Sequence, residues 1–216
     1  LFREENIPIQ AELSVLQQQY GTIAGKMTIQ FKEQEYTLQQ AAQFLENPDR
    51  AIREEVYLKI QERRLQDQTS MHDLFTSLIQ KRNQVAINAG FANYRDYKFQ
   101  ELGRFDYAKE DCYQFHDAIK LHVLPLIDKI YARKKKKLGL TTLKPWDTEA
   151  EPAGIEPLRP FTDGRDLLDK SIKCLDALNP FFGDCLRKMD ALNHLDLDSR
   201  KGKAPGGYNM PLAESG

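Results

Sequence analysis

The sequence predicts a mainly α-helical protein, a helical array with a small β-hairpin and a short β segment near the C-terminus. Apolar residues recur three or four positions apart over most of the chain, which is the spacing of one helix face. Glycine or proline stands where most of these runs end. The period changes to two only around residues 27–37 and 195–198, and these stretches predict the β elements.

The chain before residue 38 is expected to form one helix, over residues 8–24, and one hairpin. The apolar stripe of the helix consists of Ile9, Leu13, Leu16, Tyr20 and Ile23. Gly25 can end this helix. The residues that alternate with polar neighbours in the hairpin are Met27, Ile29 and Phe31. Because an isolated two-stranded hairpin is marginally stable, it should lie on helices.

The longest helix is expected to begin at Asn47 and Pro48, with Asn47 as the N-cap and Pro48 in the first helical position. Its helical spacing continues until Gly90. The stripe consists of Ile52, Val56, Ile60, Met71, Leu74, Phe75, Leu78, Ile79, Val85 and Ala86. A helix of this length needs partners along its whole face, which implies a large helical array.

A short helix over residues 93–102 should precede a longer one that begins at Asp106 or Ala108. Pro125 lies inside the longer helix and should kink it. The residues expected to point inward from it are Cys112, Phe115, Ile119, Val123, Leu126, Ile127 and Ile130. The basic run 133–137 at its end could bind phosphate, but lysines also favour the negative end of a helix dipole.

A proline-rich stretch divides the chain. Residues 141–162 contain Pro145, Pro152, Pro157 and Pro160, which predict an extended connection and not a flexible linker. It follows an N-terminal helical region with the hairpin, residues 1–140, and precedes residues 163–216. Two further helices are expected there, over residues 163–178 and from residue 180 to about 192.

Composition excludes several kinds of partner. Lys and Arg total 31 against 32 Asp and Glu, so the chain lacks the basic excess of a general nucleic-acid binder. No apolar run approaches the length of a membrane span, so no membrane partner is expected. The cysteines (Cys112, Cys174 and Cys185) are odd in number and lack CxxC spacing. This favours a reducing compartment and a cytoplasmic protein.

The four histidines (His72, His116, His122 and His194) do not form a recognisable metal motif, because neither HExxH nor another pair on one helix face occurs. The glycine-rich stretch 201–207 lacks the order of a phosphate-binding loop. Residue patterns alone therefore predict a soluble helical domain without identifiable chemistry. The first residue, Leu1, and the ending at Gly216 lead us to expect a piece of a longer protein.

Beyond these patterns, residues 195–208 resemble a known family segment. They read LDLDSRKGKAPGGY, which is similar to the D-L-x-x-R-x-G-K segment of the thimet oligopeptidase and oligoendopeptidase F family of zinc metallopeptidases. The A-P-G-G-Y continuation resembles the oligoendopeptidase F branch most. Four earlier stretches resemble the same branch in the same order: residues 47–55, 90–97, 104–107 and 143–147.

The resemblance implies a helical shell around a channel, in an enzyme that hydrolyses internal bonds of short peptides. The family's zinc ligands and its general base, the Glu of HExxH, lie on a later helix with no counterpart here. Residues 163–216 would then be the truncated start of the catalytic region. The resemblance implies zinc in the complete enzyme, no zinc bound by this chain, and no activity of the chain alone. Its expected partners are short peptides and the remainder of the catalytic domain.

The resemblance also suggests a peptide-binding segment. In related zinc peptidases, a strand just upstream of HExxH pairs with the substrate backbone, and chain spacing assigns this role here to Gly206, Gly207, Tyr208 and Asn209. A strand edge can pair with any extended peptide, and glycine allows close approach. A glycine turn between strands is the alternative for this segment. For the whole chain, the alternative is a non-catalytic helical interaction module.

Overall fold

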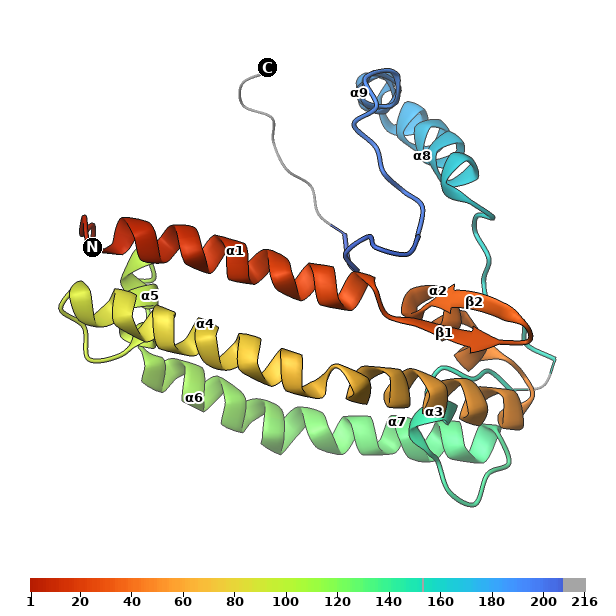
Figure 1. The fold of residues 1–216 in the computed structure, drawn as a ribbon. Coiled ribbons are helices and arrows are strands. Elements are labelled where there is room, and N and C mark those ends of the chain that lie inside the picture. The colour runs from red at the N-terminus through yellow and green to blue at the C-terminus, as the bar shows by residue number, and fades with distance from the viewer. Residues whose placement is uncertain (153, 208–216) are drawn as a thin grey trace. The chain divides into compact units, whose positions relative to one another are not determined.

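The computed structural model describes residues 1–152 and 154–207 (Figure 1). Contacts divide the chain into two compact units. Unit 1 comprises Leu1–Ala150 and the described residues from Lys201 onward, and unit 2 comprises Glu151–Arg200. Helices dominate both units, as the sequence predicts. Within the described ranges, no helix has both the length and the apolar character required to cross a bilayer.

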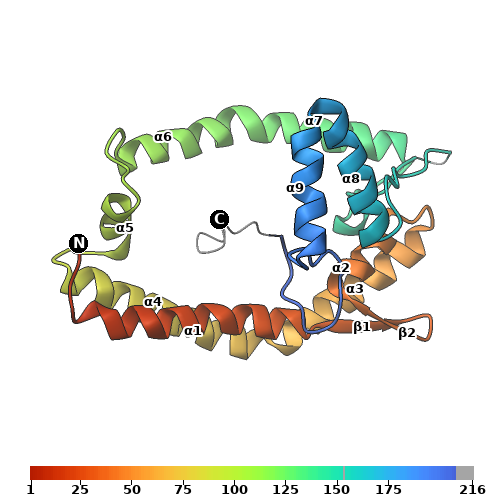
Figure 2. The same ribbon diagram turned by 90° about the horizontal axis from the view of Figure 1, so that it is seen from above.

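In unit 1, helix α1 (Asn6–Gly25) packs along α4 (Gln68–Asn88), as Figures 1 and 2 show. Their shared core consists of Leu13, Leu74, Leu78, Val85, Ala86, Ala89 and Tyr97. The buried Asn6 side chain donates to the carbonyl oxygen of Val85 at 3.0 Å, so its polar group is satisfied. The expected N-terminal helix and its end at Gly25 are confirmed.

The expected hairpin consists of β1 (Thr28–Phe31) and β2 (Gln34–Thr37), paired antiparallel with Ile29 opposite Tyr36. Lys32 and Glu33 form its two-residue turn with φ values of 49° and 64°, the backbone sign that a type I′ turn requires. The hairpin packs on α2 (Leu38–Ala42) and α3 (Arg50–Gln66). The core here consists of Met27, Ile29, Phe31, Leu38, Ala41, Val56 and Ile60.

The longest predicted helix differs from the structure at its start and in its middle. The 3-10 helix η1 (Gln43–Glu46) ends before Asn47, and α3 begins only at Arg50. The N-cap is therefore Asp49, whose side chain accepts from the N–H of Ala51, and the predicted N-cap at Asn47 was wrong. Asp67, with φ −98° and ψ 11°, then separates α3 from α4.

The expected short helix is confirmed as α5 (Tyr94–Glu101), and the side chain of Asn93 is its N-cap. A long helical rod follows, made of α6 (Lys109–Ala118), the π-helical turn η2 (Ile119–Val123) and α7 (Leu124–Lys137). Pro125 lies in the first turn of α7, directly after η2. Because proline crowds the preceding turn, the expected distortion at this point takes the form of the wider π turn.

The inward stripe predicted for this rod is not buried. No residue of α6, η2 or α7 is buried in the structure. The large apolar side chains exposed on the rod are Tyr113, Phe115, Leu121, Val123, Leu124, Leu126, Ile130 and Tyr131. The periodicity correctly predicted a helix, but burial also needs a packed neighbour, and the described residues do not supply one.

Unit 2 contains an antiparallel pair, α8 (Gly164–Leu178) and α9 (Pro180–Ala191), which Figure 2 shows side by side. Asn179 ends α8 and caps α9, since its side chain accepts from the N–H of Phe181. Residues 194–200 form neither helix nor strand. The short β segment expected near the C-terminus is also absent from residues 201–207, because no described segment pairs with it.

Candidate functional site

The segment 201–207, which leads to the predicted peptide-binding residues, lies against the end of α1 and the hairpin. The N–H of Gly202 donates to the carbonyl oxygen of Gly25 at 2.6 Å. The ammonium of Lys201 lies 2.7 Å from Oε1 of Glu35 in β2. A hydrogen bond from Lys201, with a second from Thr28, lowers the pKa of Glu35. The segment is therefore attached at two points far away in the sequence.

Two glycines of α1, Gly21 and Gly25, form what we call the glycine seat. A Cβ atom added to Gly25 would lie 2.8 Å from the carbonyl oxygen of Lys203. One added to Gly21 would lie 3.1 Å from Cβ of Ala204. Because real Cβ atoms rarely approach other atoms so closely, the segment can contact α1 only where α1 carries no side chain. Gly25 is buried by this contact.

The structure places two of the four predicted peptide-binding residues. Gly206 and Gly207 come directly after the residues that contact the glycine seat. Both are exposed, and Gly206 has a φ of 104°. Among the residues that the structure describes, no atom beyond the adjacent positions lies within 4 Å of a Cβ added to either glycine. Tyr208 and Asn209 lie outside the described residues.

A shallow depression of about 370 Å³ lies beside the seat. It is lined by Gln17, Gln18, Tyr20, Gly21, Thr22, Gly202, Ala204 and Pro205. Its side chains offer amide, hydroxyl and phenol groups but none that is charged. The depression therefore lacks the acid and base pair that hydrolysis of a peptide would need.

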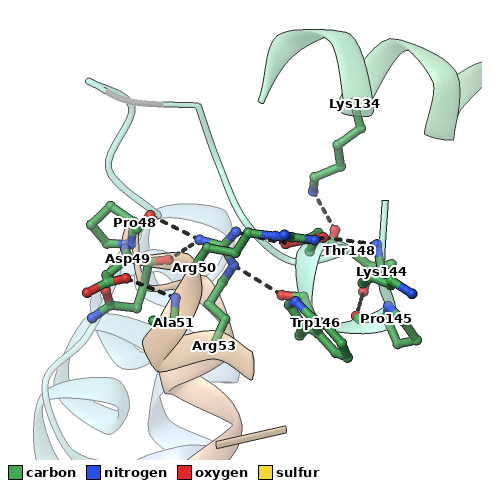
Figure 3. Close-up of polar contacts among 12 residues, drawn as sticks. Pro48, Asp49, Arg50, Ala51, Arg53, Lys134, Lys144, Pro145, Trp146 and Thr148 are labelled. Atoms are coloured by element: carbon green, nitrogen blue, oxygen red, sulfur yellow. Dashed lines mark hydrogen bonds and ion pairs between the residues drawn. The ribbon is translucent and has the colours of Figure 1, made fainter. Parts of the chain in front are cut away.

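A second polar group, the arginine cluster, consists of Arg50, Arg53 and Asp147. Figure 3 labels the two arginines and the residues on either side of Asp147. Asp147 belongs to the 3-10 helix η3 (Pro145–Asp147) of the proline-rich stretch, and both arginines lie in α3. Oδ1 of Asp147 accepts from Arg50 and Arg53, at 3.0 and 2.9 Å. Oδ2 accepts from Arg50 and from the N–H of Lys144, each at 2.9 Å. The buried carboxylate thus has every acceptor position filled.

These contacts indicate that the arginine cluster has a structural role and not a catalytic one. Burial alone would raise the pKa of Asp147, but hydrogen bonds from Arg50, the Lys144 N–H and Arg53 outweigh it and lower the pKa to about 2. A general base needs a pKa nearer the working pH and a free lone pair, and Asp147 has neither. The cluster therefore fastens the proline-rich stretch to the first turn of α3.

Stability should consequently fall in acid. The folded-state pKa of about 2 lies below the ordinary value of 3.8, so this contribution is complete above about pH 4 and is lost as the pH falls toward 2. We expect the urea midpoint of the chain to fall more steeply between pH 4 and pH 2 than that of Asp147→Asn. Equal slopes in the two proteins would contradict the lowered pKa.

The described residues do not fit a zinc ion. No group of three or more His, Cys, Asp or Glu side chains comes together anywhere in residues 1–152 and 154–207. All three cysteines are unpaired. Since a protein zinc site needs at least three such ligands, no catalytic step through a metal can be assigned to these residues.

Comparison with known proteins gives a consistent result. Residues 43–216 match the sequence model of peptidase family M3. The fold is similar to that of PZ peptidase A, solved with an inhibitor, with a TM-score of 0.87 and 25% identity over 96% of this chain and 37% of that one. No curated protein sequence matches the chain.

Two further structures share the fold. One protein, described as an oligoendopeptidase F, has a TM-score of 0.86 and 24% identity over 95% of this chain and 36% of that chain. Another, described in the same way and from Bacillus anthracis str. Ames, has a TM-score of 0.86 and 21% identity over 96% and 38%. The chain thus spans little more than a third of the length of these relatives.

Proposed function

The chain belongs to peptidase family M3, and from this we infer that it is part of a zinc-dependent oligopeptidase that cleaves internal bonds of short peptides in the cytoplasm. The match over residues 43–216 is the observation that carries the proposal. The similarity in fold to PZ peptidase A supports it, and the three unpaired cysteines agree with a reducing compartment.

In this proposal the chain supplies peptide binding and the remainder of the catalytic domain supplies the chemistry. Residues 163–216 begin the catalytic region, and zinc is bound by residues beyond those described. The zinc ion would activate water and polarise the scissile carbonyl group. Gly206, Gly207, Tyr208 and Asn209 would pair through their backbone with the extended peptide. Backbone pairing suits such an enzyme because every peptide offers the same N–H and C=O groups.

We expect the 216-residue chain alone to show no peptidase activity and to bind no stoichiometric zinc, because the described residues offer no ligand set. The full-length peptidase that carries this chain should cleave an internally quenched peptide and lose that activity with a chelator. Metal analysis and fluorescence assays on both proteins test this. One equivalent of chelatable zinc on the chain alone would contradict the prediction. An inactive, correctly folded full-length protein would favour the helical interaction module.

A further inference from the structure

We propose that the glycine seat sets the register in which Gly206 and Gly207 meet a bound peptide, so that Gly21 and Gly25 act as positioning residues for cleavage. This inference rests on the proposed function, since it assumes that residues 206–209 pair with the peptide. It assigns a role to the end of α1, about 180 positions earlier in the chain than the segment it positions.

The first observation that supports the proposal is a direct backbone contact between the end of α1 and residues 202–203. The N–H of Gly202 donates to the carbonyl oxygen of Gly25, and the carbonyl oxygen of Lys203 lies only 2.8 Å from the position that a Cβ of residue 25 would take. A contact between two backbones fixes the position of the segment along α1, because no flexible side chain intervenes. The ion pair of Lys201 with Glu35 adds a second fixed point on the hairpin.

The second observation that supports the proposal is the short distance along the chain from Ala204, which contacts the seat, to the peptide-binding residues. Ala204 contacts the seat at Gly21, and Gly206 follows only two residues later. A shift of the seated segment by one residue would be transmitted to Gly206 and Gly207, which have no side chains of their own to hold them. In a paired strand, such a slip exchanges the two faces and moves the opposing peptide by one position.

Replacement of Gly25 by Ala in the full-length peptidase tests the seat. At an ordinary helix position this change stabilises a helix, but here the new methyl group would displace the backbone of residues 202–203. We expect kcat to fall about tenfold or more, while KM changes less, because a displaced strand still binds peptide in a shifted register. In a peptide of defined sequence, the cleaved bond should move, as mass spectrometry of the products would show.

A second readout does not depend on activity. Displacement of the segment should speed tryptic cleavage after Lys201 and Lys203 in the folded Gly25→Ala protein. Gly21→Ala should have a smaller effect, since among the described residues its methyl group would meet the side chain of Ala204 and no backbone atom. The double variant Gly21→Ala with Ala204→Gly should restore the original cleavage position, because it removes the methyl group of residue 204 that would crowd the new one at residue 21.

The control is Ala11→Gly, at an exposed position of α1 far from the seat, which weakens the helix without touching residues 201–205. It should leave the cleavage position unchanged. A Gly25→Ala protein with normal kcat and cleavage position would overturn the inference, even if its stability fell. If Gly207→Pro has a lowered kcat/KM in that case, the proposed peptide binding is retained and only the positioning role of the seat is rejected. If Gly207→Pro is also fully active, both fail.

Discussion

Replacing Asp147 with asparagine is expected to lower the free energy of unfolding of the chain by about 3–5 kcal/mol, the range seen when one partner of a buried ion pair is removed. Asp147 is fully buried and the side chain of Arg53 is only 4% exposed. Without the carboxylate, Arg53 would keep its hydrogen bonds to backbone carbonyls but lose its counter-charge. Urea unfolding at pH 7, followed by circular dichroism, measures the loss.

The matched control is Glu55→Gln, which breaks the exposed pair of Glu55 and Lys59. Such surface pairs contribute at most about 1 kcal/mol, so the control should unfold close to the original midpoint. A stronger test replaces Arg50, Arg53 and Asp147 together by Met, Met and Leu. This variant should recover only part of the lost stability, because no unpaired charge remains buried but the carbonyl oxygens of Asn47, Pro48 and Trp146 lose their donor. An Asp147→Asn protein as stable as the control would refute the structural role of the arginine cluster.

Replacing Gly207 with proline in the full-length peptidase should lower kcat/KM at least tenfold, which corresponds to about 1.4 kcal/mol of transition-state stabilisation. Proline removes the N–H that the proposal pairs with the peptide and restricts the strand backbone. Zinc content should stay unchanged, because no described residue near position 207 is part of a metal-binding group. Assays with an internally quenched peptide and metal analysis give both quantities.

Two comparison variants separate the loss of the Gly207 N–H from other effects of the substitution. Gly207→Ala keeps the N–H, and among the described residues its methyl group meets no atom beyond the adjacent positions within 4 Å, so the loss of activity should be much smaller than with proline. Tyr208→Phe tests whether the phenol hydroxyl adds to the backbone contribution. A folded, metal-loaded Gly207→Pro enzyme with unchanged kcat/KM would exclude an essential hydrogen bond from this N–H and favour the glycine turn.

The elements of the fold could be predicted where local pattern decides them. Alternation at Met27, Ile29 and Phe31 predicted the hairpin, and helical spacing predicted the helices. The start of α3 could not be predicted, because Asn47 and Asp49 both accept from a backbone N–H two residues ahead. The choice depends on Arg53, whose guanidinium binds the carbonyl oxygens of Asn47 and Pro48 and keeps them outside the helix.

The candidate site was only partly predictable, for a related reason. The spacing of Gly21 and Gly25, four positions apart on one helix face, is a local signal of close backbone approach. Its partner, residues 202–204, could not be found without the fold, because no local rule relates positions so far apart. The exposed apolar stripe of α6 and α7 is a second example. Periodicity predicts that a helix has an apolar face, but it does not predict which segment packs on that face.

The arginine cluster has a consequence for the order of folding. Arg53 and Asp147 are 94 positions apart, so α3 and its hairpin can form during synthesis long before Asp147 leaves the ribosome. Closing so long a loop carries an entropic cost that local contacts do not, which makes this pairing a late event. Until then the first turn of α3 carries two arginines without their counter-charge. A nascent chain halted before residue 147 would therefore expose two cationic side chains at the start of α3.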